Sequence, residues 1–557
     1  MSHRGYPTVA SASVVMAAGT VISRTTGLVR NILLVAAIGL GTAHADVFNV
    51  ANTIPNSLYI LVAGGIFNVV LVPQLVRAMR SDPDGGQAYA NRIITLGALV
   101  LTAVSVVLVV VAPLLMHIFA SGNYFTCAAL QPEKESLITF ARWCLPQIFF
   151  YGMFVLVGQI LNARGTFGPM MWAPITNNIV SIAVIGSYLA LYHSQPAAGG
   201  YTSSQETLLG LGSTVGIAIQ MLVLLPYLRR SGFTIHPRLD FRGTGLGHTM
   251  RLGSWTIGFV IVDQIAFWVV THIATSGTSQ SSCTAGGAHP AHAAGFTVYS
   301  NAFLITQVPH SIVTVSLATA LMPLASRLAA EGRIRELARE TAQTLRLVLS
   351  VMVPAAIAVL VLGPFLATVL FSWGKGSGQT ASLGTTLIAF SPGLLLFSVY
   401  YVLLRGFYAM EDTRTPFVVE CLIAAVNIVL AVLLTIGVGP DAVAPNLAWA
   451  YSASYAAGAL ALAVLLSRRL GGLAGHETVR FIIRVAVAAF PAAAVAWGVV
   501  RGLEAAGLDE SSKAASLVML VAGGAAGLLT FSFLARVLHI REVTKMLSIV
   551  VTRLSRV

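Results

Sequence analysis

The chain has 557 residues, of which 56% are hydrophobic and only 10% are charged, and its mean hydropathy is +0.82. Because soluble proteins carry about 25% charged residues, this composition excludes a soluble globular protein and indicates a polytopic membrane protein. The net charge of +13 does not indicate nucleic-acid binding, since the basic residues lie between apolar runs.

Apolar runs of about 20 residues or more predict an all-α chain with fourteen transmembrane helices. They cover residues 14–40, 47–76, 93–118, 136–161, 170–192, 208–228, 252–275, 296–325, 344–371, 384–409, 416–437, 443–466, 481–502 and 514–535. With a cytoplasmic N-terminus, all but five of the 33 Lys and Arg residues lie on or toward the inside; the exceptions are Lys134, Arg142, Lys375, Arg501 and Lys513. This asymmetry predicts that both termini are cytoplasmic and that the basic loops meet anionic phospholipids.

The first helix carries two arginines inside an otherwise apolar run. Arg24 and Arg30 lie within VVMAAGTVISRTTGLVRNILLVAAIGL, with Ser23 and Asn31 beside them. An arginine near the centre of a spanning helix costs about 2.5–3.5 kcal/mol on insertion scales, so such residues usually face a wet cavity or an anionic partner. The run therefore favours an anion site. The alternative is that the long side chain of either arginine places its guanidinium among the cytoplasmic lipid headgroups. 

The second helix opens with polar residues at three- and four-residue spacing, which places Asp46, Asn49, Asn52 and Asn56 on one face. A polar stripe on a spanning helix faces protein or water rather than lipid. The pattern is equally compatible with a cavity lining and with hydrogen bonds to a neighbouring helix.

Related proline-containing segments recur at similar offsets. ILNARGTFGP closes at Pro169 and FYAMEDTRTP at Pro416; Pro55 and Pro309 form a second pair, and Pro73 and Pro323 a third. Offsets near 250 residues predict two six-helix halves of the same orientation, a transporter architecture with the substrate site between the halves. The alternative is that proline and glycine simply recur at helix ends. The predicted parts are residues 1–235, 236–475, 476–540 (helices 13 and 14) and a basic tail at 541–557.

Asp263 in the seventh helix is the one acid well inside its apolar run. It is a candidate proton or cation site, a counter-ion for an arginine, or a protonated structural group. Gln307 in helix 8 is a candidate cavity residue, whereas Asn427 in helix 11 is compatible with a simple interhelical hydrogen bond.

Cys127 and Cys283 fall in predicted external loops, where disulfides are stable, so we predict a bridge that joins the two halves on the outer face. The four cysteines have no metal-type spacing. The sequence also lacks Walker A, HExxH, paired Cys-x-x-Cys and GxSxG motifs, so it predicts neither an enzyme nor a bound cofactor or metal.

Several segments resemble the MurJ (MviN) lipid II flippases of the multidrug/oligosaccharidyl-lipid/polysaccharide exporter superfamily. They are SRTTGLVRN, ADVFNVANTIPNSL, FNVVLVP, ILNARGTFGPMMWAP with the later NN, and GFYAMEDTRTP, the most specific of them. The resemblance implies a protein of the bacterial plasma membrane that moves undecaprenyl-linked peptidoglycan precursor (lipid II) from the inner to the outer leaflet. Cell-wall synthesis and division proteins are the protein partners that this role suggests.

By the same resemblance, the family's essential helix-1 arginines match Arg24 and Arg30, the serine before them matches Ser23, and the helix-2 acid matches Asp46. The family's helix-2 arginine falls on Tyr59 and its helix-8 arginine on Leu304, which makes the expected cavity less positive. A glutamate of some members falls on Gln307. The expected substrate-binding residues are Ser23, Arg24, Arg30, Asp46, Asn49, Asn52 and Gln307.

The sodium site proposed for some relatives is matched at Asn427, but its carboxylates fall on Val270 and Ala431. Asp263 is then a substitute acid, and membrane potential, H⁺ and Na⁺ are the candidate coupling sources.

The expected mechanism is alternating access, with the diphosphate held by the arginine forks and the polyprenyl tail in a groove formed by helices 13 and 14. The alternatives are a drug/cation antiporter, a flippase for another polyprenyl oligosaccharide, or a membrane scaffold for the cell-wall machinery.

Overall fold

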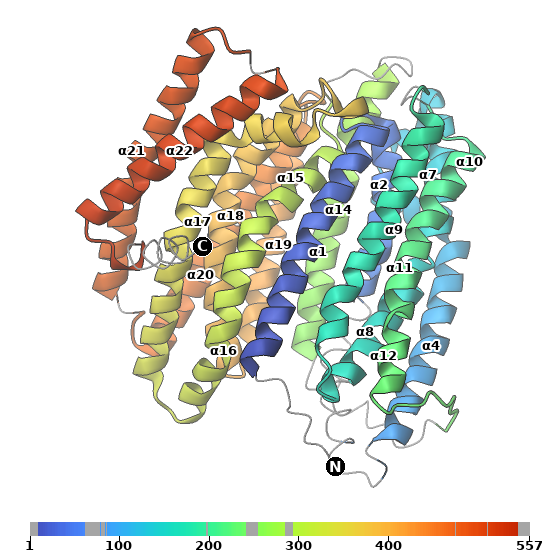
Figure 1. Ribbon diagram of the computed structural model, residues 1–557, viewed down its shortest axis with the longest axis horizontal. Coiled ribbons are helices and arrows are strands. Elements are labelled where there is room, and N and C mark those ends of the chain that lie inside the picture. The colour runs from blue at the N-terminus through green and yellow to red at the C-terminus, as the bar shows by residue number, and fades with distance from the viewer. Residues whose placement is uncertain are drawn as a thin grey trace. The chain divides into compact units, whose positions relative to one another are not determined.

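The structure is a computed structural model that describes residues 9–61, 78, 84, 86–195, 199–240, 254–284, 293–473, 475–509 and 511–543 (Figure 1). Within these ranges the chain is helical and has no β-strand. Thirteen of the described helices are long and apolar enough to cross a membrane. The predicted second helix is not among them, because its residues from 62 to 76 lie outside the described part; so do residues 544–557 of the predicted tail.

The chain packs as two units, Met1–His289 and Pro290–Val557. In unit 1, α1 packs along α9, α4 along α8, and α2 against α7, α8 and α14. Its elements are α1 (Val9–Ile38), α2 (Ala43–Tyr59), α4 (Gln87–Val110), α5 (Ala112–Phe119), α6 (Asn123–Thr126), η2 (Ala128–Leu130), α7 (Gln131–Cys144), α8 (Gln147–Ala163), α9 (Gly168–Tyr192), α10 (Ser203–Glu206), the π-helix η3 (Thr207–Leu211), α11 (Gly212–Leu222), α12 (Leu224–Arg230) and α14 (Ser254–Thr284).

In unit 2, α18 packs against α15, α17 and α20. Helices α21 and α22 pack against each other and against α17 (Figure 1). Its elements are α15 (Phe296–Pro309), the π-helix η4 (His310–Thr314), α16 (Val315–Ala330), α17 (Ile334–Phe371), η5 (Gly374–Gly376), α18 (Ala381–Ala409), α19 (Arg414–Thr435), α20 (Val443–Leu470), α21 (Gly475–Ala505) and α22 (Lys513–Val537).

The units differ from the predicted division at residues 235 and 236. Helix α14, which sequence symmetry predicts as the first helix of the second half, packs against α2 and α5 in unit 1. Helices α21 and α22 belong to unit 2 rather than forming a separate part.

Prolines explain where long predicted helices divide. The run predicted at 93–118 is α4 followed by α5, which has Pro113 in its first turn. The run predicted at 136–161 is α7 followed by α8, whose N-cap is Pro146. Proline has no N–H for the helix ladder and clashes with the preceding turn, so a helix tends to restart there.

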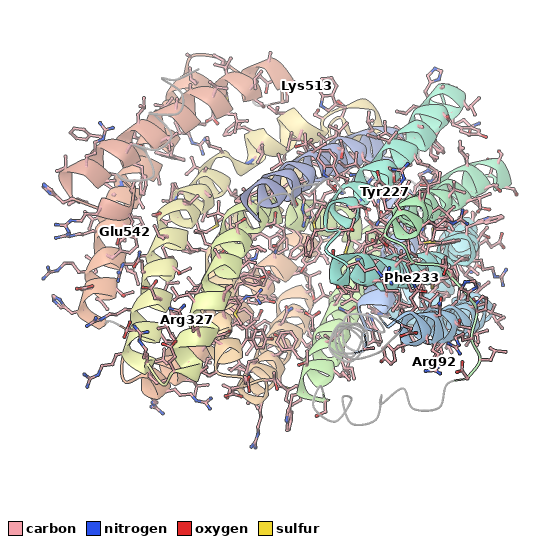
Figure 2. All side chains as sticks on the ribbon, turned by 60° about the horizontal axis from the view of Figure 1, so that its bottom comes forward. Arg92, Tyr227, Phe233, Arg327, Lys513 and Glu542 are labelled. Carbon is pink, nitrogen blue, oxygen red and sulfur yellow. A yellow bond between two sulfur atoms is a disulfide. The ribbon has the colours of Figure 1, made fainter. Side chains whose placement is uncertain are left out.

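The segment after α12 is extended and attached to α4. Gln87 Nε2 donates to the Gly232 carbonyl at 3.1 Å and Asn91 Nδ2 to the Thr234 carbonyl at 3.1 Å. Arg92, labelled with the buried Phe233 in Figure 2, forms an ion pair with Asp240 at 2.5 Å. The connection that leaves α12 therefore remains part of unit 1 up to residue 240.

Candidate functional site

Helix α1 presents its two arginines differently. Arg24 is exposed, whereas Arg30 is half-buried and donates from Nη2 to Asn31 Oδ1 at 3.4 Å. Neither guanidinium forms an ion pair with a carboxylate of the described residues. Thr25 and Thr26 donate back to the carbonyls of Val21 and Ile22 at 3.0 and 2.9 Å, so their hydroxyl hydrogens are used within the helix. The helix thus carries two positive charges that remain available to an anion.

A tyrosine near Arg30 packs against a second tyrosine. Tyr59, at the end of α2, stacks on Tyr151 of α8 with 5.4 Å between ring centroids. Tyr151 is close enough to Arg30 for their charges to interact. Sequence reasoning does not single out Tyr151, because a tyrosine within QIFFYGMFVL resembles any aromatic residue of an apolar helix. Phenol hydroxyls beside a guanidinium can donate hydrogen bonds to the same anion.

Ser23 is held to α9 through its backbone. Its carbonyl accepts a hydrogen bond from Asn178 Nδ2 at 2.9 Å, and the same amide donates to Thr26 Oγ1 at 2.9 Å. The structure gives the Ser23 hydroxyl no contact of its own that argues for substrate binding, so that part of the prediction stays a prediction.

The polar stripe of α2 is divided between neighbouring helices. Asp46 is 0% exposed and accepts a hydrogen bond from Thr278 Oγ1 of α14 at 2.6 Å. Asn52 Oδ1 accepts from Gln147 Nε2 of α8 at 3.1 Å, and Asn49 Nδ2 donates to the Ala45 carbonyl of its own helix at 3.0 Å. Only Asn56 is exposed. Of the two alternatives for this stripe, hydrogen bonding to neighbouring helices is what the structure contains at Asp46 and Asn52.

Asp263 takes part in a chain of polar contacts between α14 and α2. It is half-buried and accepts from Gln264 Nε2 at 3.0 Å. Gln264 Oε1 in turn accepts from the buried Ser57 hydroxyl, which also accepts from Trp268 Nε1 at 3.3 Å. A change in the charge of Asp263 would therefore act on the contact between α2 and α14.

The C-terminal part of α14 is also attached covalently to the segment between α6 and η2. Cys127 and Cys283 form a disulfide with 6.2 Å between their α-carbons. Thr275 Oγ1 accepts from the Ser121 amide at 2.7 Å, and Asn123 Nδ2 donates to Ser279 Oγ at 3.4 Å. The predicted pairing of Cys127 with Cys283 is therefore present, and both cysteines lie in unit 1.

The remaining predicted residues belong to unit 2. Gln307 Nε2 donates to the Tyr451 hydroxyl at 3.5 Å, within an aromatic cluster that includes Phe303 and Phe390. Asn427 is buried, and its Oδ1 has no hydrogen-bond partner among the described residues. Val270 and Ala431 stand at the positions where the resemblance expects carboxylates of a sodium site. Val270 belongs to unit 1 and Ala431 to unit 2.

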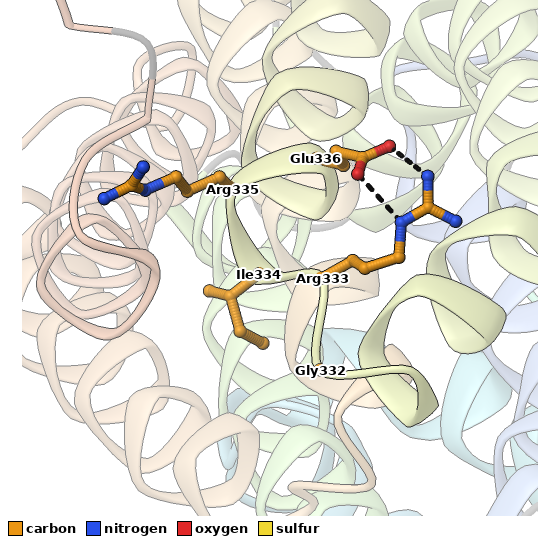
Figure 3. Close-up of a pocket in the computed structure, with 5 residues that line it drawn as sticks. All are labelled: Gly332, Arg333, Ile334, Arg335 and Glu336. Carbon is orange, nitrogen blue, oxygen red and sulfur yellow. Dashed lines mark hydrogen bonds and ion pairs between the residues drawn. The ribbon is translucent and has the colours of Figure 1, made fainter.

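Two further kinds of polar site are relevant among the residues that the structure describes, a metal site and a surface pocket. Among the described residues, no group of three or more His, Cys, Asp or Glu side chains is arranged to hold a metal. Gly332–Glu336 line a small pocket at the start of α17 (Figure 3). There Arg333 contacts Glu336 at 2.6 Å and Glu331 at 2.8 Å, and these carboxylates raise the pKa of its guanidinium. Its charge is therefore already balanced.

The family model described as "Lipid II flippase MurJ" matches residues 34–508. The chain belongs to the MurJ family. The matched range contains Asp46, Asp263, Gln307 and Asn427 but begins after both arginines of α1, so the match itself does not address Arg24 or Arg30. The "Probable lipid II flippase MurJ" of Haemophilus influenzae is 28% identical over 409 residues, which is 71% of this chain and 75% of that protein.

Solved structures agree with the MurJ fold. The structure described as "Lipid II flippase MurJ, inward closed conformation" matches with a TM-score of 0.69 at 17% identity, covering 94% of this chain and 99% of that chain. An inward-facing multidrug resistance MATE family transporter of the MOP superfamily matches with a TM-score of 0.62 at 13% identity, covering 83% and 99%. These likenesses establish the fold alone, that of a polytopic α-helical membrane protein.

Proposed function

We propose that this chain flips lipid II from the inner to the outer leaflet of the bacterial plasma membrane, and that it acts as a transporter rather than an enzyme. The observation that carries the proposal is the pair Arg24 and Arg30, two cations in a spanning helix without a carboxylate partner among the described residues. Family membership and the printed function of the relatives support it.

The two guanidinium groups bind the diphosphate of the precursor. A guanidinium presents paired N–H donors that match phosphate oxygens, and it stays charged at any physiological pH. Arg30 is half-buried and so loses less water on binding than an exposed lysine would, and the hydroxyl of Tyr151 adds a donor beside it. Ser23, Asn49, Asn52 and Gln307 supply hydrogen bonds to the headgroup, whereas the fully buried Asp46 sets the charge balance from within the protein.

Transport proceeds by alternating access, with the two six-helix halves rocking about the headgroup. Proton uptake by Asp263 couples to the cycle, because its neighbours Gln264 and Ser57 connect α14 to α2. Membrane potential adds a driving force on the charged headgroup. Sodium coupling is disfavoured, since Val270 and Ala431 stand where the sodium-binding relatives carry carboxylates.

The polyprenyl tail stays in lipid, in a groove formed by α21 and α22. Both helices carry large exposed apolar side chains, among them Phe490 (77% exposed) and Phe533 (65%). Both termini lie in the cytoplasm, where the basic loops bind anionic phospholipids and contact cell-wall synthesis and division proteins.

A proteoliposome assay of lipid II accessibility tests this function. R24A and R30A should each abolish flipping while leaving membrane insertion intact, and R24K tests whether charge without the fork suffices. R501A is the matched control, because Arg501 is paired with Glu504 at 2.8 Å. Normal flipping by both alanine variants would overturn the proposal.

A further inference from the structure

Asn178 of α9 is a buried amide that holds the arginine-bearing turn of α1. It is 6% exposed, and its Nδ2 donates two hydrogen bonds of 2.9 Å each, to the Ser23 carbonyl and to Thr26 Oγ1. Because a backbone carbonyl only accepts, only the NH₂ end of the amide fits against Ser23. The side chain therefore acts as a donor fork across the α1–α9 contact.

The face of α1 that meets α9 is built from small residues. Gly19, Ser23 and Gly27 recur every four positions and so share one face. A β-carbon at Gly19 would lie 3.0 Å from Trp172 Nε1, and one at Gly27 would lie 3.6 Å from Asn178 Nδ2. The two helices are thus close along this face, and Asn178 supplies its polar contact (Figure 1).

The rotation of α1 decides where the arginines project. Arg24 follows Ser23 directly and is turned by about 100° from the α9 face, which agrees with its exposure. Arg30 comes seven residues after Ser23, two turns along, and lies near Tyr151. Small residues alone would allow the helix to rotate or slide, since van der Waals packing is not directional in the way that a hydrogen bond is.

We propose that Asn178 is a positioning residue that fixes the rotation of α1 and so aims Arg24 and Arg30 at the diphosphate. The inference rests on the proposed function. Asn178 does not touch the precursor; it acts through the two guanidinium groups.

Substitutions of Asn178 and of Thr26 test the two hydrogen bonds of this contact separately. N178A removes both donated bonds, and N178D replaces the donor with an acceptor that faces the Ser23 carbonyl, so N178D should be the more harmful. T26V removes one acceptor and leaves the Ser23 bond, whereas T26S keeps the hydroxyl. N177A is the matched control, because the neighbouring buried Asn177 packs toward Gly216 of α11 rather than toward α1.

The experiment measures the dissociation constant of fluorescently labelled lipid II for the purified full chain in nanodiscs. We expect N178A to weaken binding about tenfold, which corresponds to about 1.4 kcal/mol, and T26V about threefold. T26S should bind like the wild type and N177A within about twofold of it. In the R24A/R30A background, N178A should cause no further loss, because a residue that acts through the arginines has nothing left to position.

Equal losses for N178A and N177A would overturn the inference, as would an N178A loss that adds in full to that of R24A/R30A. If N178A fails to fold, T26V against T26S decides the same question. Normal binding by R24A/R30A would remove the proposed function and this inference with it. Weak binding by R24A/R30A together with normal binding by N178A would remove only the role of Asn178.

Discussion

Helices α1 and α14 of unit 1 both carry polar residues, but they differ in whether those residues have partners within the protein. The polar groups of α14 bond to neighbours: Gln264 to Ser57, Thr278 to Asp46, and Cys283 to Cys127. The cations of α1 have no carboxylate partner among the described residues, and the helix contacts α9 through small side chains and one amide. A buried polar group whose hydrogen bonds are all made stabilises the fold, whereas a charged group without a partner in the protein can bind a ligand of opposite charge.

An ion-pair partner placed beside Arg24 should remove the difference between the two helices, and it should have the largest effect on lipid II binding. T20E places a carboxylate one helical turn before Arg24, where an i,i+4 ion pair can form. We expect lipid II binding to fall by more than tenfold, because the guanidinium is then neutralised without being removed. Labelled lipid II titrations measure this, with T20Q as the uncharged control. Equal binding by T20E and T20Q would show that the charge of Arg24 is not used.

Removing a partner from α14 should instead reduce stability. T278V deletes a hydroxyl that donates to the fully buried Asp46. Loss of a donor to a buried carboxylate costs about 1–3 kcal/mol, so the unfolding temperature should fall while lipid II affinity per folded molecule is kept. Thermal unfolding in detergent checks this against S276A, a substitution at a half-buried position of the same helix. An affinity loss without a stability loss would reverse the roles assigned to the two helices.

Opening the disulfide should have a smaller effect of the same kind. Cys127 and Cys283 are 156 residues apart in sequence, so the bond restricts a long loop. We expect C127S/C283S to lower the unfolding temperature by several degrees and to make it insensitive to reductant, which the wild type should not be. Free thiols at both positions in non-reducing mass spectrometry would contradict the bond itself.

The smallest effect should come from a site outside both helices. Asp412 accepts hydrogen bonds from the Thr415 amide and hydroxyl at 3.0 and 2.7 Å and pairs with Arg469. Partial burial disfavours its charge, but these bonds together hold the pKa of Asp412 below its ordinary value. A depressed pKa gives stability above the unfolded-state pKa of about 3.9, and that stability disappears as pH falls through the folded-state pKa.

D412A should therefore cost about 1 kcal/mol at pH 7, a typical value for losing a helix-start cap. The difference from wild type in thermal unfolding should shrink between pH 5 and pH 3. A constant difference across this range would show that packing, not charge, is what Asp412 contributes.

Much of the fold could be predicted because hydropathy alone defines a spanning helix. The runs at 170–192 and 384–409 correspond closely to α9 and α18. The start of α17 at Ile334, ten residues before the predicted 344, could not be found this way, because its first turns carry Arg335, Glu336 and Arg339.

The site was less accessible to sequence reasoning. The arginines stand out because a charge in an apolar run is rare. Asn178 and Tyr151 do not stand out, since their importance depends on which helix lies opposite. The packing of α14 with unit 1 could not be read from the repeat either, because symmetry in sequence does not determine which neighbour a helix contacts.

The Cys127–Cys283 bond also records which way the chain was inserted. Thiols become oxidised on the exterior side of a bacterial plasma membrane and stay reduced in the cytosol. A molecule threaded in the opposite sense would keep both sulfurs reactive toward a maleimide, and a correctly inserted one would not. A gel-shift with such a reagent on intact cells, before and after reduction, would therefore count upright and inverted copies in the membrane where the chain was inserted.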